Sequence, residues 1–478
     1  SALNKLSDYL YEIPKSFRKD MRVPARVYTS EHMLSQVVAD RSLWQLINVA
    51  TLPGIQKYSL AMPDIHEGYG FPIGGVAAMA IDEDGVISPG GIGYDINCGV
   101  RLLSSDLPLQ EVKPHLETIA NQIFHSVPSG VGRSGSVKLK LADLDKVLEQ
   151  GAPRMVELGF GTESDLEACE SNGHLADAMP LLVSEHAKDR GKDQLGTLGS
   201  GNHFLEIQVV DEIFDQETAN VFGLKHGYVT AMIHCGSRGL GHQVCTDYVR
   251  DMLNANAKWR IDLIDRQLAC APFHSAEGQN YFMAMKACAN FAWANRHLIG
   301  HRIREAFLRV FGQTARLNTV YDVAHNIGKV ETHDIDGVRK KVVVHRKGAT
   351  RAFGPKQREL GARFKATGQP VLIPGTMGTA SYVLAGAAHG MTEAFGSACH
   401  GAGRAMSRHA AKKLQSGAEV KHALANLDIR VFTDAMRGLA EEAPYAYKDI
   451  EEVVSVVDGA ELARKVARLR PLAVVKGD

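Results

Sequence analysis

The chain has 478 residues, which is long enough to bury a sizeable core without disulfides or a structural metal. Hydrophobic residues make up 45% of it and charged residues 23%, the balance of an ordinary globular protein. No segment has the unbroken apolar run of a membrane span, so we expect a soluble protein without a membrane partner. The 54 basic and 54 acidic side chains cancel, so a polyanion would have to be bound by a local cluster.

Cysteine usage and chain organisation suggest a compact intracellular protein. The seven cysteines are scattered without paired spacing, and the N-terminal residues lack the apolar core of an export signal. We therefore expect a reducing, cytoplasmic setting. No internal repeat or Pro/Ser-rich linker is visible, which predicts a single domain over residues 1–478.

Hydrophobic periodicity predicts a mixture of helices and strands. Helices are expected, in chain order, over residues 31–50 with Ser30 as N-cap, then 111–126, 141–158, 239–258 and 276–311. Strands are expected over 74–81, 203–210, 227–234, 318–325, 341–345 and 370–374. Because the two kinds of element do not alternate regularly, the predicted fold class is α+β, with mixed sheets and surrounding helices.

The segment GIGYDINCGVR, residues 91–101, places an acid and a thiol three positions apart among glycines. Asp95 and Cys98 fit two interpretations. They could be a turn residue and a small buried hydrophobe, or two ligands of one metal site.

Three histidines stand at the ends of predicted strands beside glycines. His234 ends GYVTAMIH, His325 ends LNTVYDVAH, and His203 opens HFLEIQVV after the Gly-rich GTLGSGN. Each alone fits a structural, hydrogen-bonded histidine, but the repeated context favours convergence on one metal-binding rim. Strand alternation adds a condition: His203 reaches that rim only if its strand begins after it or twists there. Thiolate with imidazoles favours zinc, whereas a carboxylate and a two-metal site suit harder ions, so the residues leave the metal open.

A fourth histidine lies in the segment CHGAGRAMSRHAAKKL, which places His400 at the predicted start of a helix. Glycine N–H groups and the helix dipole favour an anion there, and Arg404 and Arg408 add positive charge. A neutral imidazole beside a phosphate could attack it and form a phosphoramidate. The alternatives are a histidine that only donates to the phosphate, or a helix cap without a ligand.

Three further features have weaker interpretations. Asp64 and His66 in MPDIHEG could support a ligand or contact a substrate, whereas His333 and Asp334 are expected at the surface. Residues 338–354 carry six basic side chains without an acid, which fits either a polyanion contact or a solvated edge strand.

Taken together, these stretches resemble the RtcB family of RNA-splicing ligases. The resemblance runs in family order from about residue 20 to the end of the sequence. Its motifs are GGIGYDINCGVR, GTLGSGNHFLEIQ, MIHCGSRGLGHQV, YDVAHNIGKVE, VHRKGATRAFG, LIPGTMGTASYVLAG, CHGAGRAMSR, APYAYKDI and VVKG.

The resemblance implies one catalytic domain of RtcB type with two Mn²⁺ ions in a cleft. Cys98 would bridge the ions, Asp95 and His203 would bind one of them, and His234 and His325 the other. His400 would take GMP from GTP, and Glu206 and Lys476 would contact the edge of the guanine base. The implied GTP pocket consists of Asn202, His203, Phe204, Leu205, Glu206, His325, Asn326, Pro374, Gly375, Thr376, Met377, Ser381, Gly401, Ala402, Gly403, Tyr447 and Lys476.

The implied activity is the joining of RNA 2′,3′-cyclic phosphate or 3′-phosphate ends to 5′-hydroxyl ends, in tRNA splicing or RNA repair. It would proceed through GMP-histidine and RNA(3′)pp(5′)G intermediates. RNA, as tRNA halves or broken ends, would be the partner, and an archease-type activator is a candidate second partner. Two alternatives remain: a metal-dependent phosphohydrolase with the same ligands but no nucleophile at His400, and a non-catalytic RNA-binding scaffold.

Overall fold

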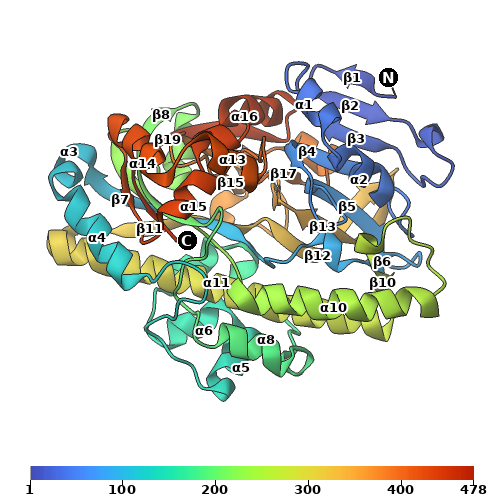
Figure 1. Ribbon diagram of the computed structural model, residues 1–478, viewed down its shortest axis with the longest axis horizontal. Helices are drawn as coiled ribbons and strands as arrows, with labels where there is room; N and C mark the ends of the chain where they lie inside the picture. Colours follow the sequence, from blue (N-terminus) through green and yellow to red (C-terminus); the bar gives the residue numbers. More distant parts are fainter. Residues whose placement is uncertain (1, 478) are drawn as a thin grey trace.

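The structure, a computed structural model, describes residues 2–477 and is organised around two large sheets above two long helices (Figure 1). The seven-stranded sheet is antiparallel except between β3 and β4. Its strands, in spatial order, are β1 (Asn4–Ser7), β2 (Leu10–Ile13), β3 (Ala25–Tyr28), β4 (Ser59–His66), β5 (Ile73–Ala80), β13 (Val338–Lys347) and β12 (Asn326–Ile335).

The eight-stranded sheet carries most of the candidate site. Its main path, in spatial order, is β11 (Leu317–Ala324), β7 (Gly99–Pro108), β9 (Tyr228–Cys235), β8 (Phe204–Ile213), β19 (Ala463–Lys476), β16 (Ser381–Gly386) and β15 (Pro370–Ile373). The remaining strand, β18 (Arg430–Phe432), pairs in parallel with β19. Two small sheets pair β10 (Ala271–Pro272) with β6 (Val86–Ile87) and β14 (Ala349–Arg351) with β17 (Ser397–Cys399). These mixed sheets, without a βαβ repeat, confirm the predicted α+β class.

Helices surround the sheets. The α-helices are α1 (Leu34–Ala39), α2 (Ser42–Val49), α3 (Leu109–Val112), α4 (Leu116–Ser126), α5 (Leu141–Gln150), α6 (Ala152–Glu157), α7 (Glu163–Glu167), α8 (Glu185–Gly191), α9 (Gln216–Phe222), α10 (Arg238–Lys258), α11 (Ala276–Phe311), α12 (Ala388–Glu393), α13 (Arg408–Leu414), α14 (Gly417–Asn426), α15 (Met436–Glu441) and α16 (Ile450–Gly459). The 3₁₀ turns are η1 (Lys15–Phe17), η2 (Pro89–Gly91), η3 (Lys113–His115), η4 (Glu170–Gly173), η5 (Pro180–Leu182), η6 (Arg266–Leu268), η7 (Gly312–Thr314), η8 (Ala362–Phe364) and η9 (Pro444–Ala446).

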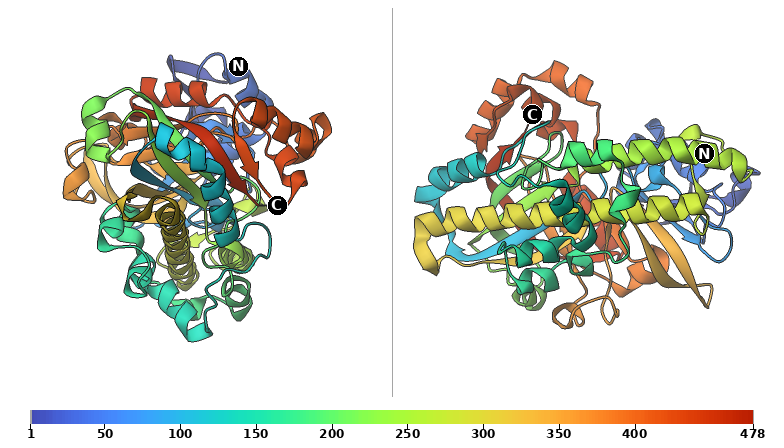
Figure 2. Two further views of the ribbon diagram at one scale, coloured as in Figure 1. Left: turned by 90° about the vertical axis from the view of Figure 1, so that its left-hand side faces the viewer. Right: turned by 90° about the horizontal axis from the view of Figure 1, so that it is seen from below.

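Helix α11 is the long axis around which the other layers pack. It has 36 residues, and at a rise of 1.5 Å per residue it is about 54 Å long. The hydroxyl of Ser275 caps it by accepting from the Gly278 N–H, and its bounds confirm the predicted helix over 276–311. It contacts strands of both large sheets, with α10 alongside and α5 and α6 beneath it (Figures 1 and 2). Because neighbours lie on most of its sides, its buried residues are not confined to one stripe.

Three other predicted helices are interrupted. The helix predicted over 31–50 is two short helices separated at Asp40, and the Ser30 hydroxyl accepts from Met33 in a turn that precedes α1. Pro114 lies in a 3₁₀ turn that divides the helix predicted over 111–126. At Gly151 the chain takes a φ of +64°, which ends α5 before α6 begins. In contrast, α10 matches its predicted range to within one residue.

The basic segment 338–354 has an exposed end and a buried end: Arg339 and Lys341 are exposed, as a solvated strand predicts, whereas Arg346 and Arg351 are buried. Strand β13 lies between β5 and β12, so it is not an edge strand. Arg346 is wholly buried and forms a two-pronged ion pair with Glu331, at 2.6 and 2.9 Å. His333, expected at the surface, is also buried and lies 2.8 Å from the same carboxylate, whereas Asp334 is exposed as expected. The buried Arg346, neutralised by Glu331, offers no free charge to a polyanion.

Within residues 2–477, no helix combines the length and the apolar character that crossing a bilayer requires. All seven cysteines are buried and carry free thiols.

Candidate metal centre and nucleotide cleft

Strand register brings the first predicted ligands to one edge of the eight-stranded sheet. Cys98 stands directly before β7 and His325 directly after β11, and these two strands pair in register at that end. The His325 N–H donates to the Cys98 carbonyl at 2.8 Å. On the other side of β7, Val100 pairs with His234. Three donors far apart in the sequence therefore lie on adjacent strand ends.

The same edge continues across β8 and β19. His203 stands directly before β8, so the strand begins after it, as the alternation argument required. Phe204 pairs with His234 of β9 on one side and with Lys476 of β19 on the other. The predicted guanine-contacting lysine thus lies on the same edge as the ligands.

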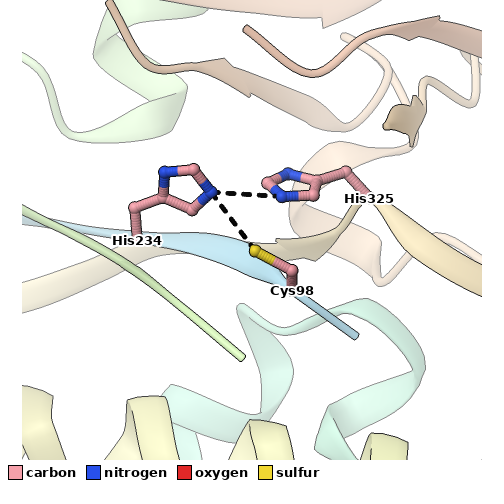
Figure 3. A group of neighbouring side chains, drawn as sticks. All are labelled: Cys98, His234 and His325. Atoms are coloured by element: carbon pink, nitrogen blue, oxygen red, sulfur yellow. Dashed lines mark hydrogen bonds between the residues drawn. The ribbon is translucent and has the colours of Figure 1, made fainter. Parts of the chain in front are cut away.

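Cys98, His234 and His325 form the first compact set of donors (Figure 3). The His234 Nε2 lies 3.3 Å from the Cys98 sulfur and 3.2 Å from the His325 Nε2. Burial, and then neighbouring imidazoles, hold the pKa of both His234 and His325 well below its usual range. Two neutral rings whose Nε2 atoms face each other, one of them beside the thiol, are suited to a cation, because neutral imidazole nitrogen is a metal donor.

Asp95, Cys98 and His203 form a second set that shares the thiol with the first. The His203 Nε2 lies 2.7 Å from the Asp95 Oδ2 and 3.4 Å from the Cys98 sulfur. The other carboxylate oxygen, Oδ1, accepts from the Ser237 N–H at 3.1 Å. In each set the donor atoms lie within 4.8 Å of one another. Donors that share one tetrahedral ion at bond lengths of about 2.0–2.3 Å lie roughly 3.3–3.8 Å apart. The two His234 contacts and the contact of His203 with the thiol are close to this range, whereas Asp95 and His203 lie closer together.

The shared thiol needs a cation to become a thiolate. Burial, followed by the Asp95 carboxylate, raises the pKa of Cys98 to about 12. At neutral pH the proton therefore stays on the sulfur unless a metal displaces it.

His400 reaches the centre from a small sheet rather than from a helix. It follows β17, and α13 begins only at Arg408, so the predicted helix start at His400 is wrong and the helix-dipole argument does not apply. The intervening loop turns at Gly403, whose φ is +78°. A Cβ there would lie 2.2 Å from the Asp64 carbonyl oxygen, so glycine allows the loop to press against β4.

Asp64 holds His400 in place. Its Oδ2 bonds to the His400 Nδ1 and accepts from the His400 backbone N–H at 3.1 Å. The carboxylate is wholly buried, and its Oδ1 has no hydrogen-bond partner among the described residues. Because Nδ1 is engaged, Nε2 is the nitrogen that remains for an electrophile. The His400 ring meets the His325 ring edge-on, with centroids 4.9 Å apart.

His66, two residues after Asp64, also lines the cleft. Its Nδ1 lies 2.8 Å from the Asp64 carbonyl oxygen. Burial lowers the pKa of His66 to about 4, so its ring is neutral at physiological pH.

A cleft of about 1260 Å³ joins both donor sets and His400 to the predicted nucleotide pocket. Most of the pocket residues expected from the resemblance line this cleft. They are Asn202, His203, Phe204, His325, Asn326, Pro374, Gly375, Thr376, Met377, Gly401, Ala402, Gly403, Tyr447 and Lys476.

Three expected pocket residues lie behind the cleft wall. Leu205 packs in the hydrophobic core, on the opposite face of β8 from Phe204. The Ser381 hydroxyl accepts from the Gly375 N–H at 3.0 Å and so supports the loop in front of it. Glu206 is buried, and its Oε2 has no hydrogen-bond partner among the described residues. Burial raises the pKa of Glu206 well above its usual range.

The far end of the cleft is a buried polar network around Glu442. Its carboxylate accepts from Arg404 at 3.0 Å, from Arg408 at 2.8 Å and from the Tyr447 hydroxyl. The Lys476 ammonium donates to backbone carbonyls in the 201–203 loop, and burial lowers its pKa to about 8 although Glu442 opposes this shift. Three cations around one carboxylate leave this end of the cleft positive.

Sequence patterns gave no signal for two groups that border the site. Asn295 and Arg296, in the middle of α11, bond to the backbone beneath the ligands. Tyr69, Tyr94 and His242 form an aromatic group on the cleft wall, with centroid distances of 5.4 Å and 4.8 Å from Tyr94. The first group lies within a long helix of mixed polarity and the second is assembled from three separate segments, so neither is visible as a motif.

Comparison with known proteins agrees with the motif resemblance. The family described as "tRNA-splicing ligase RtcB" matches residues 45–477. A tRNA-splicing ligase RtcB of Archaeoglobus fulgidus is 53% identical over 478 residues, covering 99% of each chain. That of Methanococcus maripaludis is 53% identical over the whole of both chains. An RNA-splicing ligase RtcB of Mycobacterium tuberculosis is 52% identical over 91% of this chain and all of its own. The chain, with its shared thiol, its two donor sets and its buried histidine in one cleft, belongs to the RtcB family.

Proposed function

We propose that the protein is an RNA ligase that joins 2′,3′-cyclic phosphate or 3′-phosphate ends to 5′-hydroxyl ends in tRNA splicing or RNA repair. The observation that carries the proposal is the position of His400. Its Nδ1 is bound by Asp64, and its ring contacts His325, a member of one of two donor sets that share Cys98. A phosphohydrolase needs the donor sets alone, whereas a histidine held in this way suits nucleophilic attack.

Two divalent ions are proposed at the donor sets, and by family resemblance they are Mn²⁺. Asp95 and His203 would hold one ion, His234 and His325 the other, and Cys98 both. When bound, such ions supply positive charge that stabilises the phosphate oxygens of a nucleotidyl-transfer transition state. The thiolate is also a good zinc ligand, so the identity of the metal is part of the test.

The first proposed step is transfer of GMP to His400. The lone pair of Nε2 forms an N–P bond to the α-phosphorus of GTP, the bond from that phosphorus to the bridging oxygen breaks, and pyrophosphate leaves. Asp64 keeps the ring in the orientation and tautomer that expose Nε2, and it stabilises the positive charge that develops on the ring.

Two RNA ends then react in turn. Water opens a 2′,3′-cyclic phosphate to a 3′-phosphate, whose oxygen attacks the GMP phosphorus and breaks its bond to His400, giving RNA(3′)pp(5′)G. The 5′-hydroxyl of the second RNA attacks the RNA 3′-phosphorus, loses its proton, and displaces GMP. In each step, one phosphorus atom forms a bond to the attacking group and loses its bond to the leaving group.

The guanine pocket is proposed at the end of the cleft beside Lys476. By resemblance, Glu206 would accept from the N–H groups of guanine, a contact that requires the cleft wall in front of it to open. Its unpartnered Oε2 supports this role, because a buried polar atom without a partner is costly until a ligand satisfies it. Lys476 would offer an N–H to an acceptor on the same base.

RNA is proposed to enter past the aromatic group defined above. Arg190 and Arg238 line the cleft with Tyr69, Tyr94 and His242, so this wall offers both cations for phosphates and rings for bases. Positive charge combined with stacking surfaces is the usual composition of a single-strand RNA site.

We also propose a cytoplasmic setting. The seven free thiols support it, because disulfides are rare in a reducing compartment.

The proposal is tested with GTP labelled at the α-phosphate, incubated with the protein and Mn²⁺ or Zn²⁺ in parallel. We expect an adduct that is stable to alkali and lost in acid, formed with Mn²⁺ and absent from His400→Ala. Addition of RNAs with cyclic-phosphate and 5′-hydroxyl ends should discharge the adduct and give joined RNA. Phosphate hydrolysis without an adduct would establish the phosphohydrolase alternative, and RNA binding without either reaction would establish the scaffold.

A further inference from the structure

One arginine in the middle of α11 bonds to the backbone beside two of the proposed ligands. The Nη1 of Arg296 donates to the carbonyl of Asn97 at 2.6 Å and to the carbonyl of Cys235 at 2.8 Å. Asn97 directly precedes Cys98, and Cys235 directly follows His234. A single N–H₂ group therefore joins the start of β7 to the end of β9.

The same guanidinium also reaches the strand that carries the third ligand. Its Nη2 donates to the Asn97 side-chain oxygen and to Asp322 Oδ1, both at 2.9 Å, and its Nε lies 3.1 Å from the same carboxylate. Asp322 lies on β11, three residues before His325. Arg296 thus bonds to all three adjacent chain segments, at positions one to three residues away from Cys98, His234 and His325.

The backbone around Cys98 is shaped to admit this side chain. A Cβ on Gly99 would lie 2.9 Å from the Arg296 Cζ and 2.4 Å from the Val323 carbonyl oxygen, so only glycine fits between them. Asn97 has a φ of +52°, in the left-handed region. Its hydrogen bonds to Arg296 and to the Ala289 carbonyl hold it in that conformation. The path that aims Cys98 at the cleft is therefore built against the guanidinium.

Charge pairing alone does not account for this arrangement. Arg296 and Arg101 both bond to Asp322, and all three side chains are wholly buried. Two guanidinium groups share one carboxylate, which leaves one positive charge in excess. Of the two arginines, only Arg296 also donates to backbone carbonyls. Arg101 instead contacts Asp322 and the ring of His297.

We propose that Arg296 is a positioning residue for the metal centre, whose planar fork sets the spacing of Cys98, His234 and His325. This inference rests on the metal sites proposed above. It requires that metal affinity depend on the shape of the guanidinium and not only on its positive charge, because a lysine ammonium cannot bond in the same fixed directions.

The chain supplies a matched control in Arg101. Arg296→Lys and Arg101→Lys each keep one positive charge and disturb the same buried carboxylate, but only the first removes bonds to the carbonyls beside the ligands. Chelator-treated full-length proteins are titrated with MnCl₂ alone, and affinity and stoichiometry are measured calorimetrically. Circular dichroism and the melting temperature before titration report the fold of each variant.

We expect Arg296→Lys to bind Mn²⁺ about 10- to 100-fold more weakly, the range seen when support behind a metal ligand is removed. Arg101→Lys should keep the wild-type affinity even if both variants melt at similarly reduced temperatures. Equal affinities for the two variants would overturn the inference. A wild-type protein that binds no Mn²⁺ would overturn the proposed metal sites themselves, and this inference with them.

A second variant decides the matter if Arg296→Lys does not fold. Asn97→Gly tolerates the positive φ and leaves the ion pair with Asp322 intact, while it removes the side-chain bonds to Arg296 and to the Ala289 carbonyl. We expect a several-fold loss of Mn²⁺ affinity in a protein that still folds, with a lower melting temperature because buried hydrogen bonds are lost. Wild-type affinity in this variant would contradict the positioning role.

Discussion

Asp64 and His400 meet across two different sheets, and the carboxylate bonds to both the ring Nδ1 and the backbone N–H of the histidine. Asp64→Asn removes the negative charge that would stabilise a positively charged ring during attack. We expect adduct formation with GTP to slow by about 10² or more, the usual effect of removing one preorganised group that stabilises developing charge. Single-turnover labelling measures the rate. Mn²⁺ affinity should stay unchanged because Asp64 is in neither donor set, and a wild-type rate would remove Asp64 from the mechanism.

Cys98 is the one donor common to both sets, which predicts an unequal effect of ligand substitutions on metal stoichiometry. Cys98→Ala should weaken binding of both ions. Asp95→Asn should retain the ion at His234 and His325, because that set remains complete. Metal analysis after equilibrium dialysis counts the ions. Retention of two tightly bound ions in Cys98→Ala would show that the thiol is not shared.

Two ion pairs on strand β13 should differ greatly in their contribution to stability. Arg346 and Glu331 are buried, so Glu331→Gln leaves a buried guanidinium without its carboxylate and should cost about 3–5 kcal/mol. Lys340 and Glu83 form a partly exposed pair, and Lys340→Gln should cost about 0–1 kcal/mol. Urea unfolding of both variants gives the comparison. Similar losses would mean that the buried pair is hydrated or adds little.

Lys347 predicts a pH dependence of stability. Burial lowers its pKa to about 7 from a usual value of 10.5, although two backbone carbonyls accept from its ammonium. Between these pH values the unfolded chain binds more protons than the folded chain, so this lysine makes the free energy of unfolding rise with pH. Lys347→Met removes that dependence. The variant should gain most relative to wild type below pH 7, and the gain should fade towards pH 10.5.

Denaturation curves at several pH values test the Lys347 prediction, with the partly exposed Lys340→Met as control. A constant difference between Lys347→Met and wild type across pH 6–10 would contradict it, because a constant difference reflects packing and not protonation.

Tyr94 is the central ring of the aromatic group on the proposed RNA wall. Tyr94→Ala should weaken binding of a short single-stranded RNA by about 1–3 kcal/mol, the value of one stacked base. Tyr94→Phe keeps the ring and should bind normally. Fluorescence anisotropy measures affinity, and the GTP adduct should form at the same rate in all three proteins. An unchanged affinity in Tyr94→Ala would place the RNA elsewhere in the cleft.

The sequence predicted those parts of the site that local pattern controls. Runs such as GYVTAMIH and LNTVYDVAH read as strands because apolar residues dominate them and glycines bound them, and both strands end within a residue of their histidine. Helix α11 was predictable because no proline interrupts the helical pattern of residues 276–311. The residues alone suggested that Cys98 joins the histidines as a ligand, whereas its bridging role and the division of the histidines between two ions came from family resemblance.

What the sequence could not predict depends on contacts between distant segments. Arg346 in the basic run of β13 looks exposed until the structure brings Glu331 of the neighbouring strand into an ion pair with it. His400 looked like a helix start because CHGAGR is rich in small residues, but the chain needs those residues to pass Asp64 of another sheet. The activating partner, the GTP dependence and the natural RNA substrates stay predictions from resemblance.

The place of β19 in the sheet has a consequence for biosynthesis. Residues 463–476 lie between β8 and β16, strands that leave the ribosome much earlier. Until β19 inserts, the eight-stranded sheet has a gap in its middle, and the edge that holds Lys476 next to the metal donors is incomplete. A nascent chain therefore carries all five proposed metal ligands well before it can close the pocket beside them. Metal capture could therefore precede nucleotide binding during synthesis, because β11, β7, β9 and β8 pair with one another without β19, whereas the nucleotide pocket waits for Lys476.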